Sequence, residues 1–108
     1  MITDQKVEKA LTYLAETDAQ GAEAIKQVYL GEEALKILEA QAGLQATTGP
    51  EQSKAKNQCR ASDKYRETII KLAEAKAQAA LIRNKRETAQ EIIRVYQTQS
   101  SNRRQGNI

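Results

Sequence analysis

The fold is decided by one stretch, residues 65–96, which reads YRETIIKLAEAKAQAALIRNKRETAQEIIRVY. Every third and then fourth residue of it forms a heptad seam with only two polar members. The seam is Tyr65, Thr68, Leu72, Ala75, Ala79, Ile82, Arg86, Ala89, Ile93 and Tyr96. Because neither Gly nor Pro interrupts the stretch, it predicts one long helix packed against another helix. Further apolar residues widen the seam and predict more than one helical partner.

A matching seam lies upstream, in a helix expected over about residues 4–42 with Thr3 or Asp4 as its N-cap. Its members are Ala24, Val28, Gly31, Leu35, Leu38 and Ala42. Residues 17–21 leave two interpretations open, a kink in one helix or a second helix starting at Asp18, and we favour near-continuity. Gly31 on the seam is either a point of close helix approach or a tolerated surface glycine.

The segment between the two helices is expected to be a connector over residues 43–61, either mobile or functional. Gly43 is a candidate helix-ending residue, and Thr47-Thr48-Gly49-Pro50 is a break. Ser62 or Asp63 caps the second helix, expected over about residues 62–98, and residues 99–108 form a flexible basic tail. The sequence thus predicts a single all-α domain over residues 1–108, a long antiparallel helical hairpin of coiled-coil type.

Pairing in this hairpin can be predicted from the heptad. Antiparallel coils place e flank against e flank, so Glu32 should lie near Lys76. Arg86 on the seam either extends outward to solvent or pairs with an acid such as Asp18. Because the seam is rich in Ala, the core is thin, and we expect a homo-oligomer that uses apolar residues off the seam, namely Ile70, Leu81 and Ile92.

Charge divides the chain into halves. Residues 1–50 carry four Lys and eight acids, whereas residues 51–108 carry thirteen Lys or Arg and six acids. Either the two halves are helices with complementary flanks, or the second half meets an anionic partner.

Several functional classes find no support in the residues. There is no His and a single Cys, Cys59, and no nucleophile–base arrangement or Gly-rich phosphate loop. We therefore expect no enzyme activity, no metal and no cofactor. No apolar run is long enough to cross a membrane, so we expect a cytoplasmic protein without a membrane partner.

The basic residues are the polar feature that points to a ligand. Lys64, Lys71 and Lys85 keep one heptad position on the g flank, where the first helix offers Gln27, Ala34 and Gln41 and no acid. Non-specific binding of nucleic acid needs such charge together with groups that stack on bases. The other candidate contact residues are Lys54, Lys56, Arg60, Arg83, Arg103 and Arg104.

Three stretches resemble small helical proteins of tailed phages. They are Tyr13-Leu14-Ala15-Glu16-Thr17-Asp18 followed by Ala22 and Lys26, Ser62-Asp63-Lys64-Tyr65, and Leu81-Ile82-Arg83-Asn84-Lys85-Arg86 continued by Ala89, Ile92-Ile93, Tyr96 and Ser101-Asn102-Arg103-Arg104. This chain has Tyr96 where such proteins often carry Trp. Such proteins tend to be encoded beside single-strand-annealing recombinases and single-strand-binding proteins. The resemblance implies a recombination accessory or mediator protein that touches single-stranded DNA, and it carries no residue role with it.

Two functions are therefore expected as alternatives. The first is a non-enzymatic phage-type accessory protein of DNA recombination or replication, which binds single-stranded DNA through its basic second half. A recombinase or a single-strand-binding protein would be its protein partner, and the host cytoplasm its location. The second is a structural or adaptor coiled coil with protein partners only, including host factors that it inhibits.

Overall fold

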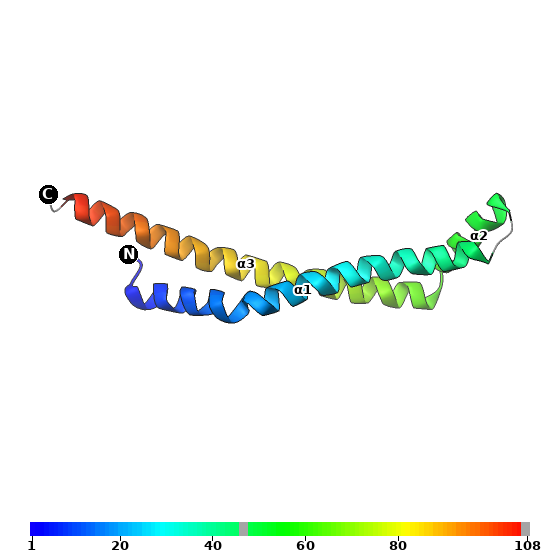
Figure 1. Cartoon of the computed structure of the whole chain (residues 1–108), viewed down its shortest axis with the longest axis horizontal. Helices are drawn as coiled ribbons and strands as arrows, with labels where there is room; N and C mark the ends of the chain where they lie inside the picture. Colours follow the sequence, from blue (N-terminus) through cyan, green and yellow to red (C-terminus); the bar gives the residue numbers. More distant parts are fainter. Residues whose placement is uncertain (46–47, 107–108) are drawn as a thin grey trace. The chain divides into compact units, whose positions relative to one another are not determined.

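The computed structural model describes residues 1–45 and 48–106, and these form three helices without a strand. Helix α1 spans Asp4–Leu44, α2 spans Gly49–Arg60 and α3 spans Asp63–Gly106 (Figure 1). The contacts divide the chain into unit 1, which is Met1–Ala22 with Ala80–Ile108, and unit 2, which is Glu23–Ala79. In each unit a stretch of α1 packs against a stretch of α3 that runs antiparallel to it. The expected all-α helical hairpin is confirmed.

The predicted seam on α3 is the packed face of that helix. Leu72, Ile82 and Ala89 are buried, and every other seam residue from Tyr65 to Tyr96 is half-buried. Ala10 and Ala24 of α1 are also buried, and none of the described side chains is completely enclosed. The core is as thin as the Ala-rich seam predicts, because Ala contributes little apolar area.

In unit 2 the helices pair as the heptad predicts. Lys76 Nζ lies 3.8 Å from a carboxylate oxygen of Glu32. A Cβ built on Gly31 would lie 2.9 Å from Cδ1 and 3.3 Å from Cβ of Leu72. Gly31 is therefore a point of close helix approach, and the residue that it faces is the large Leu72.

In unit 1 the half-buried side chain of Arg86 on α3 forms hydrogen bonds with α1. Arg86 Nη1 donates to the Leu14 carbonyl and to Thr17 Oγ1, both at 2.8 Å, and Nη2 lies 3.3 Å from Asp18 Oδ1. Pairing with Asp18 was one of the two outcomes predicted for Arg86. Thr17 is buried and donates to the Tyr13 carbonyl at 2.6 Å, so it serves the core and caps no helix. Helix α1 accordingly continues through residues 17–21, as favoured from the sequence.

Three expected boundaries are wrong. Most of the connector over residues 43–61 is helix α2, although Ala46 and Thr47 lie outside the described residues. Thr48 accepts from the Glu51 N–H at 3.2 Å and Pro50 follows it, so the apparent break begins a helix whose remaining residues favour helix. The second wrong boundary is at Gly43, which was a candidate to end the first helix. It lies inside α1 and is buried beneath Lys56 of α2.

The third wrong boundary is the end of α3, expected at residue 98. The helix continues to Gly106, so residues 99–106 are not the expected flexible tail, and residues 107–108 lie outside the description. Extending an existing helix adds one hydrogen bond for each residue fixed, so exposed polar residues can continue it without an apolar stripe. Arg103 and Arg104 also favour a C-terminal turn, where the helix dipole attracts positive charge.

One charged cluster holds α2 in unit 2. Arg60 Nε donates to Glu39 Oε1 at 2.9 Å, and the Tyr65 hydroxyl donates to the same oxygen at 2.9 Å. The cluster joins all three helices, and α2 has no buried residue of its own. The hydrogen bonds from Arg60 and Tyr65 lower the pKa of Glu39 below its usual 4.5. Ionised Glu39 is therefore favoured by the folded form.

This cluster predicts a dependence of stability on acid pH. A carboxylate whose pKa is lowered on folding stabilises the fold above the unfolded pKa, and that contribution is lost as pH falls through the folded value. The stabilisation from Glu39 should thus be complete at pH 7 and fade below about 4.5. Glu39→Gln should lower the melting temperature at pH 7 and lose its disadvantage as pH falls. A constant difference between the parent and the variant across pH 3–7, followed by circular dichroism, would contradict this role.

Candidate nucleic-acid interface

In unit 1, contacts at Asp4 and at Thr17 hold the first turns of α1 against α3. The Lys6 N–H donates to Thr3 Oγ1 at 3.3 Å, which makes Thr3 the N-cap that the sequence suggested. The Tyr96 hydroxyl of α3 donates to the Asp4 carboxylate. Thirteen residues further along α1, Thr17 is fixed by Arg86 of α3. The segment between these contacts therefore lies against α3 in a defined register.

A groove of about 640 Å³ lies between α1 and α3 within this segment. Buried Ala10 and Ala89 lie at its base, and Ile92 and Tyr13 are half-buried. The small alanine side chains leave this space, because they cannot fill the gap between two helix backbones. Its remaining lining residues are Lys6, Lys9, Asn84, Lys85 and Thr88.

Three lysines surround this apolar space. Lys6 and Lys9 come from α1 and Lys85 from α3, and all three are exposed. Among the residues that the structure describes, none of the three ammonium groups forms an ion pair or hydrogen bond. Lys6 and Lys9 lie one turn apart, a spacing that puts Cβ atoms about 5–6 Å from each other. The groove thus combines free positive charge with an apolar base and an aromatic ring.

That combination suits an anionic ligand with flat apolar parts. Ammonium groups attract phosphate, and nucleobases can stack on a tyrosine ring or lie on aliphatic carbon. Within residues 1–45 and 48–106, the Tyr13 hydroxyl has no hydrogen-bond partner, so it is available to a ligand. We refer to Lys6, Lys9, Tyr13 and Lys85 together as the lysine groove.

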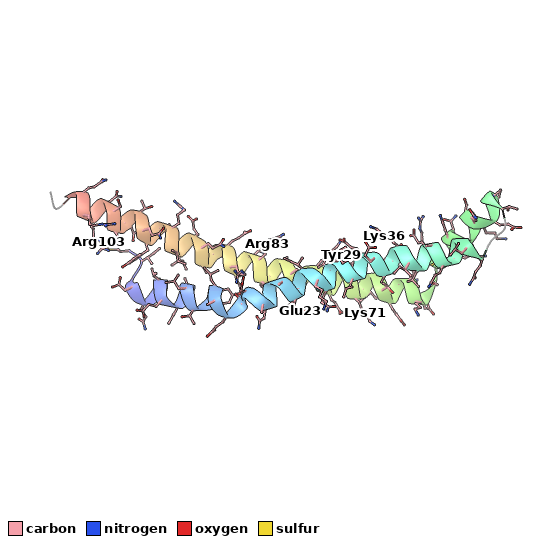
Figure 2. The ribbon with its side chains drawn as sticks, in the orientation of Figure 1. Glu23, Tyr29, Lys36, Lys71, Arg83 and Arg103 are labelled. Atoms are coloured by element: carbon pink, nitrogen blue, oxygen red, sulfur yellow. The ribbon has the colours of Figure 1, made fainter. Side chains whose placement is uncertain are left out.

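The residues predicted from sequence divide among separate places. Lys85 belongs to the lysine groove, while Lys64 and Lys71 lie on α3 in unit 2. Both are exposed and, within the described part of the chain, without ion-pair partners, as the g-flank argument predicts. Figure 2 shows the side chains of Lys71, Arg83 and Arg103 extending from the α3 ribbon.

The connector residues are different in character. Lys54 and Lys56 are exposed on α2, and the stem of Lys56 covers Gly43. Arg60 is bound to Glu39 through two nitrogens, at 2.9 and 3.4 Å. Its charge is already paired, so among the predicted contact residues Arg60 is the weakest candidate for a phosphate contact.

Lys6, Lys9 and Tyr13 were missed from the sequence. They lie in residues 1–50, which carry a net negative charge. A comparison of net charge between the two halves therefore does not point to Lys6 and Lys9. One signal could have found them. Residues 6, 9 and 13 follow the three- and four-residue spacing that brings side chains to one face of a helix.

Two other kinds of site are absent from the described residues. The described residues contain no group of three or more His, Cys, Asp or Glu side chains placed to hold a metal ion. Over the same residues, no helix is long and apolar enough to span a membrane.

Comparison with models of known protein families, with curated proteins and with solved structures found no match to this chain. The class of this protein therefore rests on its own structure, which is a helical hairpin of coiled-coil type.

Proposed function

We propose that this protein is a non-enzymatic, phage-type accessory protein of DNA recombination or replication that binds single-stranded DNA. The lysine groove is the observation that supports binding of single-stranded DNA, because it offers unpaired ammonium groups beside an apolar space and a tyrosine. The phage-type role in recombination or replication rests on the sequence resemblance alone. Phosphates would lie at Lys6, Lys9 and Lys85, and a base would enter the space beside Tyr13. A recombinase or a single-strand-binding protein would be its protein partner, in the cytoplasm of the host.

Single strands suit such a groove better than duplexes do. A base can enter an apolar space only if it is unpaired and unstacked, whereas duplex bases are enclosed between two backbones. The groove volume of about 640 Å³ lies within the usual range for small-molecule sites. Duplex DNA would still be attracted by the lysines, but without the contribution from stacking.

The test is a salt-titrated binding measurement on the whole chain. Fluorescence anisotropy with an oligo-dT of about 20 nucleotides should give an affinity that falls with salt, with a log–log slope of roughly −0.7 per phosphate contact. The matched duplex should bind more weakly at each salt concentration. Absence of binding to the single strand at low salt would exclude this function.

The alternative is a structural or adaptor coiled coil with protein partners only, which could include an inhibited host factor. Its support is the large number of apolar side chains left in solvent, ten of which are 44% exposed or more. Where such side chains lie together in one contiguous patch, they are typical of a protein interface. This alternative gains if the chain ignores DNA and co-purifies with one defined protein in a fixed ratio.

A further inference from the structure

Helix α1 carries a second line of apolar residues in unit 2. Leu30, Ile37 and Leu44 follow one another at intervals of seven residues, and they are 47%, 53% and 84% exposed. Ala34 and Gln41 fall between them at the three- and four-residue spacing of a heptad. The line contains no charged residue. It has the sequence of a coiled-coil seam, yet all of it except half-buried Ala34 is exposed to solvent.

Neither α2 nor α3 covers this line. The face of α1 that meets α3 is marked by Gly31 against Leu72, and the face that meets α2 is marked by Glu39 and Gly43. At 100° of rotation per residue, Ile37 lies about 160° from Glu39, and Leu30 about 100° from Gly31. The line therefore lies on a flank of α1 that faces no other helix of its unit.

The thin core and the exposed line together suit a protein partner, because Leu30, Ile37 and Leu44 are all close to half exposed or more. Since the buried core holds only five apolar residues among those described, covering more apolar area would stabilise the fold.

The line is self-complementary, which favours a second copy of the chain as the partner. Ile37 lies midway between Leu30 and Leu44, so a twofold axis through Ile37 sets Leu30 of one copy opposite Leu44 of the other. The same axis sets Glu32, Glu33 and Glu39 opposite Ala42, Gln41 and Leu35 of the second copy. No carboxylate then faces a like charge. Antiparallel pairing of two identical helices is thus both apolar along its centre and free of direct repulsion.

We propose that a second copy of this chain packs antiparallel along Leu30, Ile37 and Leu44, giving a dimer with its twofold axis at Ile37. The contact would span about 21 Å of helix. It does not involve Ile70, Leu81 or Ile92, the residues from which self-association was expected. It is independent of the DNA-binding function, since the lysine groove lies in unit 1.

The first test compares two variants of α1. The parent chain should have twice the mass of one copy by light scattering after gel filtration. Ile37→Asp should raise the dimer dissociation constant by at least about a hundredfold, because the axis would bring two carboxylates together in an apolar contact. Ile25→Asp is the matched control, since Ile25 is 68% exposed on the same helix but off the line. It should remain dimeric. A monomeric parent, or a dimer that survives Ile37→Asp but dissociates with Leu81→Asp, would overturn the proposal.

Cross-linking tests the orientation even where Ile37→Asp fails to fold. In a Cys59→Ser background, mild oxidation should link Ile37→Cys chains to one another. Leu30→Cys chains alone should stay unlinked, and a mixture of Leu30→Cys with Leu44→Cys chains should form the mixed dimer, since a disulfide needs Cα atoms within about 7 Å. Linkage of Leu30→Cys chains to each other would indicate parallel helices and contradict the twofold arrangement.

Discussion

Exchange of Lys6 and Lys9 for Gln is expected to weaken the binding of single-stranded DNA about 25-fold at 0.1 M salt. Each phosphate contact contributes roughly 0.7 to the log–log salt slope for a single strand, so two lost contacts remove about 1.4 log units at this concentration. The salt slope itself should become shallower by about 1.4. Both lysines line the groove and form no ion pair among the described residues, so the fold should not change. Gln is nearly as good a helix former as Lys.

The matched control is the pair Lys64→Gln and Lys71→Gln. It removes the same charge from exposed lysines, and these also lack ion-pair partners in the described chain, but they lie in unit 2. If the groove binds DNA, this control should lose affinity only slightly. Equal losses in the two double variants would show that the lysines act only through net charge. A larger loss in the control would return the site to the g flank of α3, where the sequence first predicted it.

The core of the fold could be predicted because its signal repeats. Ten seam residues on α3 agree with one period, and each is buried or half-buried in the structure. The register follows from the same period, which is why Glu32 is near Lys76 and Asp18 near Arg86. Long regular elements with many concordant residues are the most predictable parts of a fold.

The helical segments that were missed have no apolar period. Helix α2 has no buried residue, and residues 99–106 extend α3 with polar side chains. Their helicity depends on local features, which are the Thr48 cap and Pro50 for α2 and the absence of Gly from residues 99–105 for the end of α3. Such segments have no apolar face that would predict them, even when their intrinsic preference for helix is strong.

The site could be predicted only in part for a different reason. A groove between two helices depends on which side chains are too small to fill it, and on the register that places Ala10 near Ala89. Charge summed over half the chain favours α3 and overlooks Lys6 and Lys9. Lys85 is the one residue of the lysine groove that the heptad pattern of the sequence also predicted.

The second large expected effect concerns the contact of Leu72 with Gly31. Leu72 is 8% exposed and is one of the few large side chains buried among the described residues. Leu72→Ala should destabilise the fold by about 3 kcal/mol, because it removes buried methyl groups and leaves a cavity. Gly31→Ala should also destabilise it, by about 1 kcal/mol. Its added methyl gains about 1 kcal/mol of helix propensity but overpacks a contact at a cost of about 2 kcal/mol.

The double variant reveals whether the two residues act through one contact. Once Leu72 is shortened, the atom 2.9 Å from the new Cβ is gone, so Gly31→Ala should become neutral or stabilising. The coupling between the two changes should then be about 1–2 kcal/mol. Urea unfolding followed by circular dichroism measures this coupling free energy. All variants should be compared at one protein concentration, because association would shift the unfolding midpoint.

Gly21→Ala provides the control for this cycle. A Cβ on Gly21 would meet Arg86 Cδ at 3.8 Å and Ile82 Cγ2 at 3.9 Å, which are ordinary contact distances. The change should therefore stabilise the chain by about 1 kcal/mol through helix propensity alone. Its effect should add to that of Leu72→Ala, since Gly21 meets atoms of Arg86 and Ile82 and none of Leu72. If Gly31→Ala were to stabilise the parent as Gly21→Ala does, α1 and α3 would not approach closely at Gly31, and the packing of unit 2 described above would be wrong.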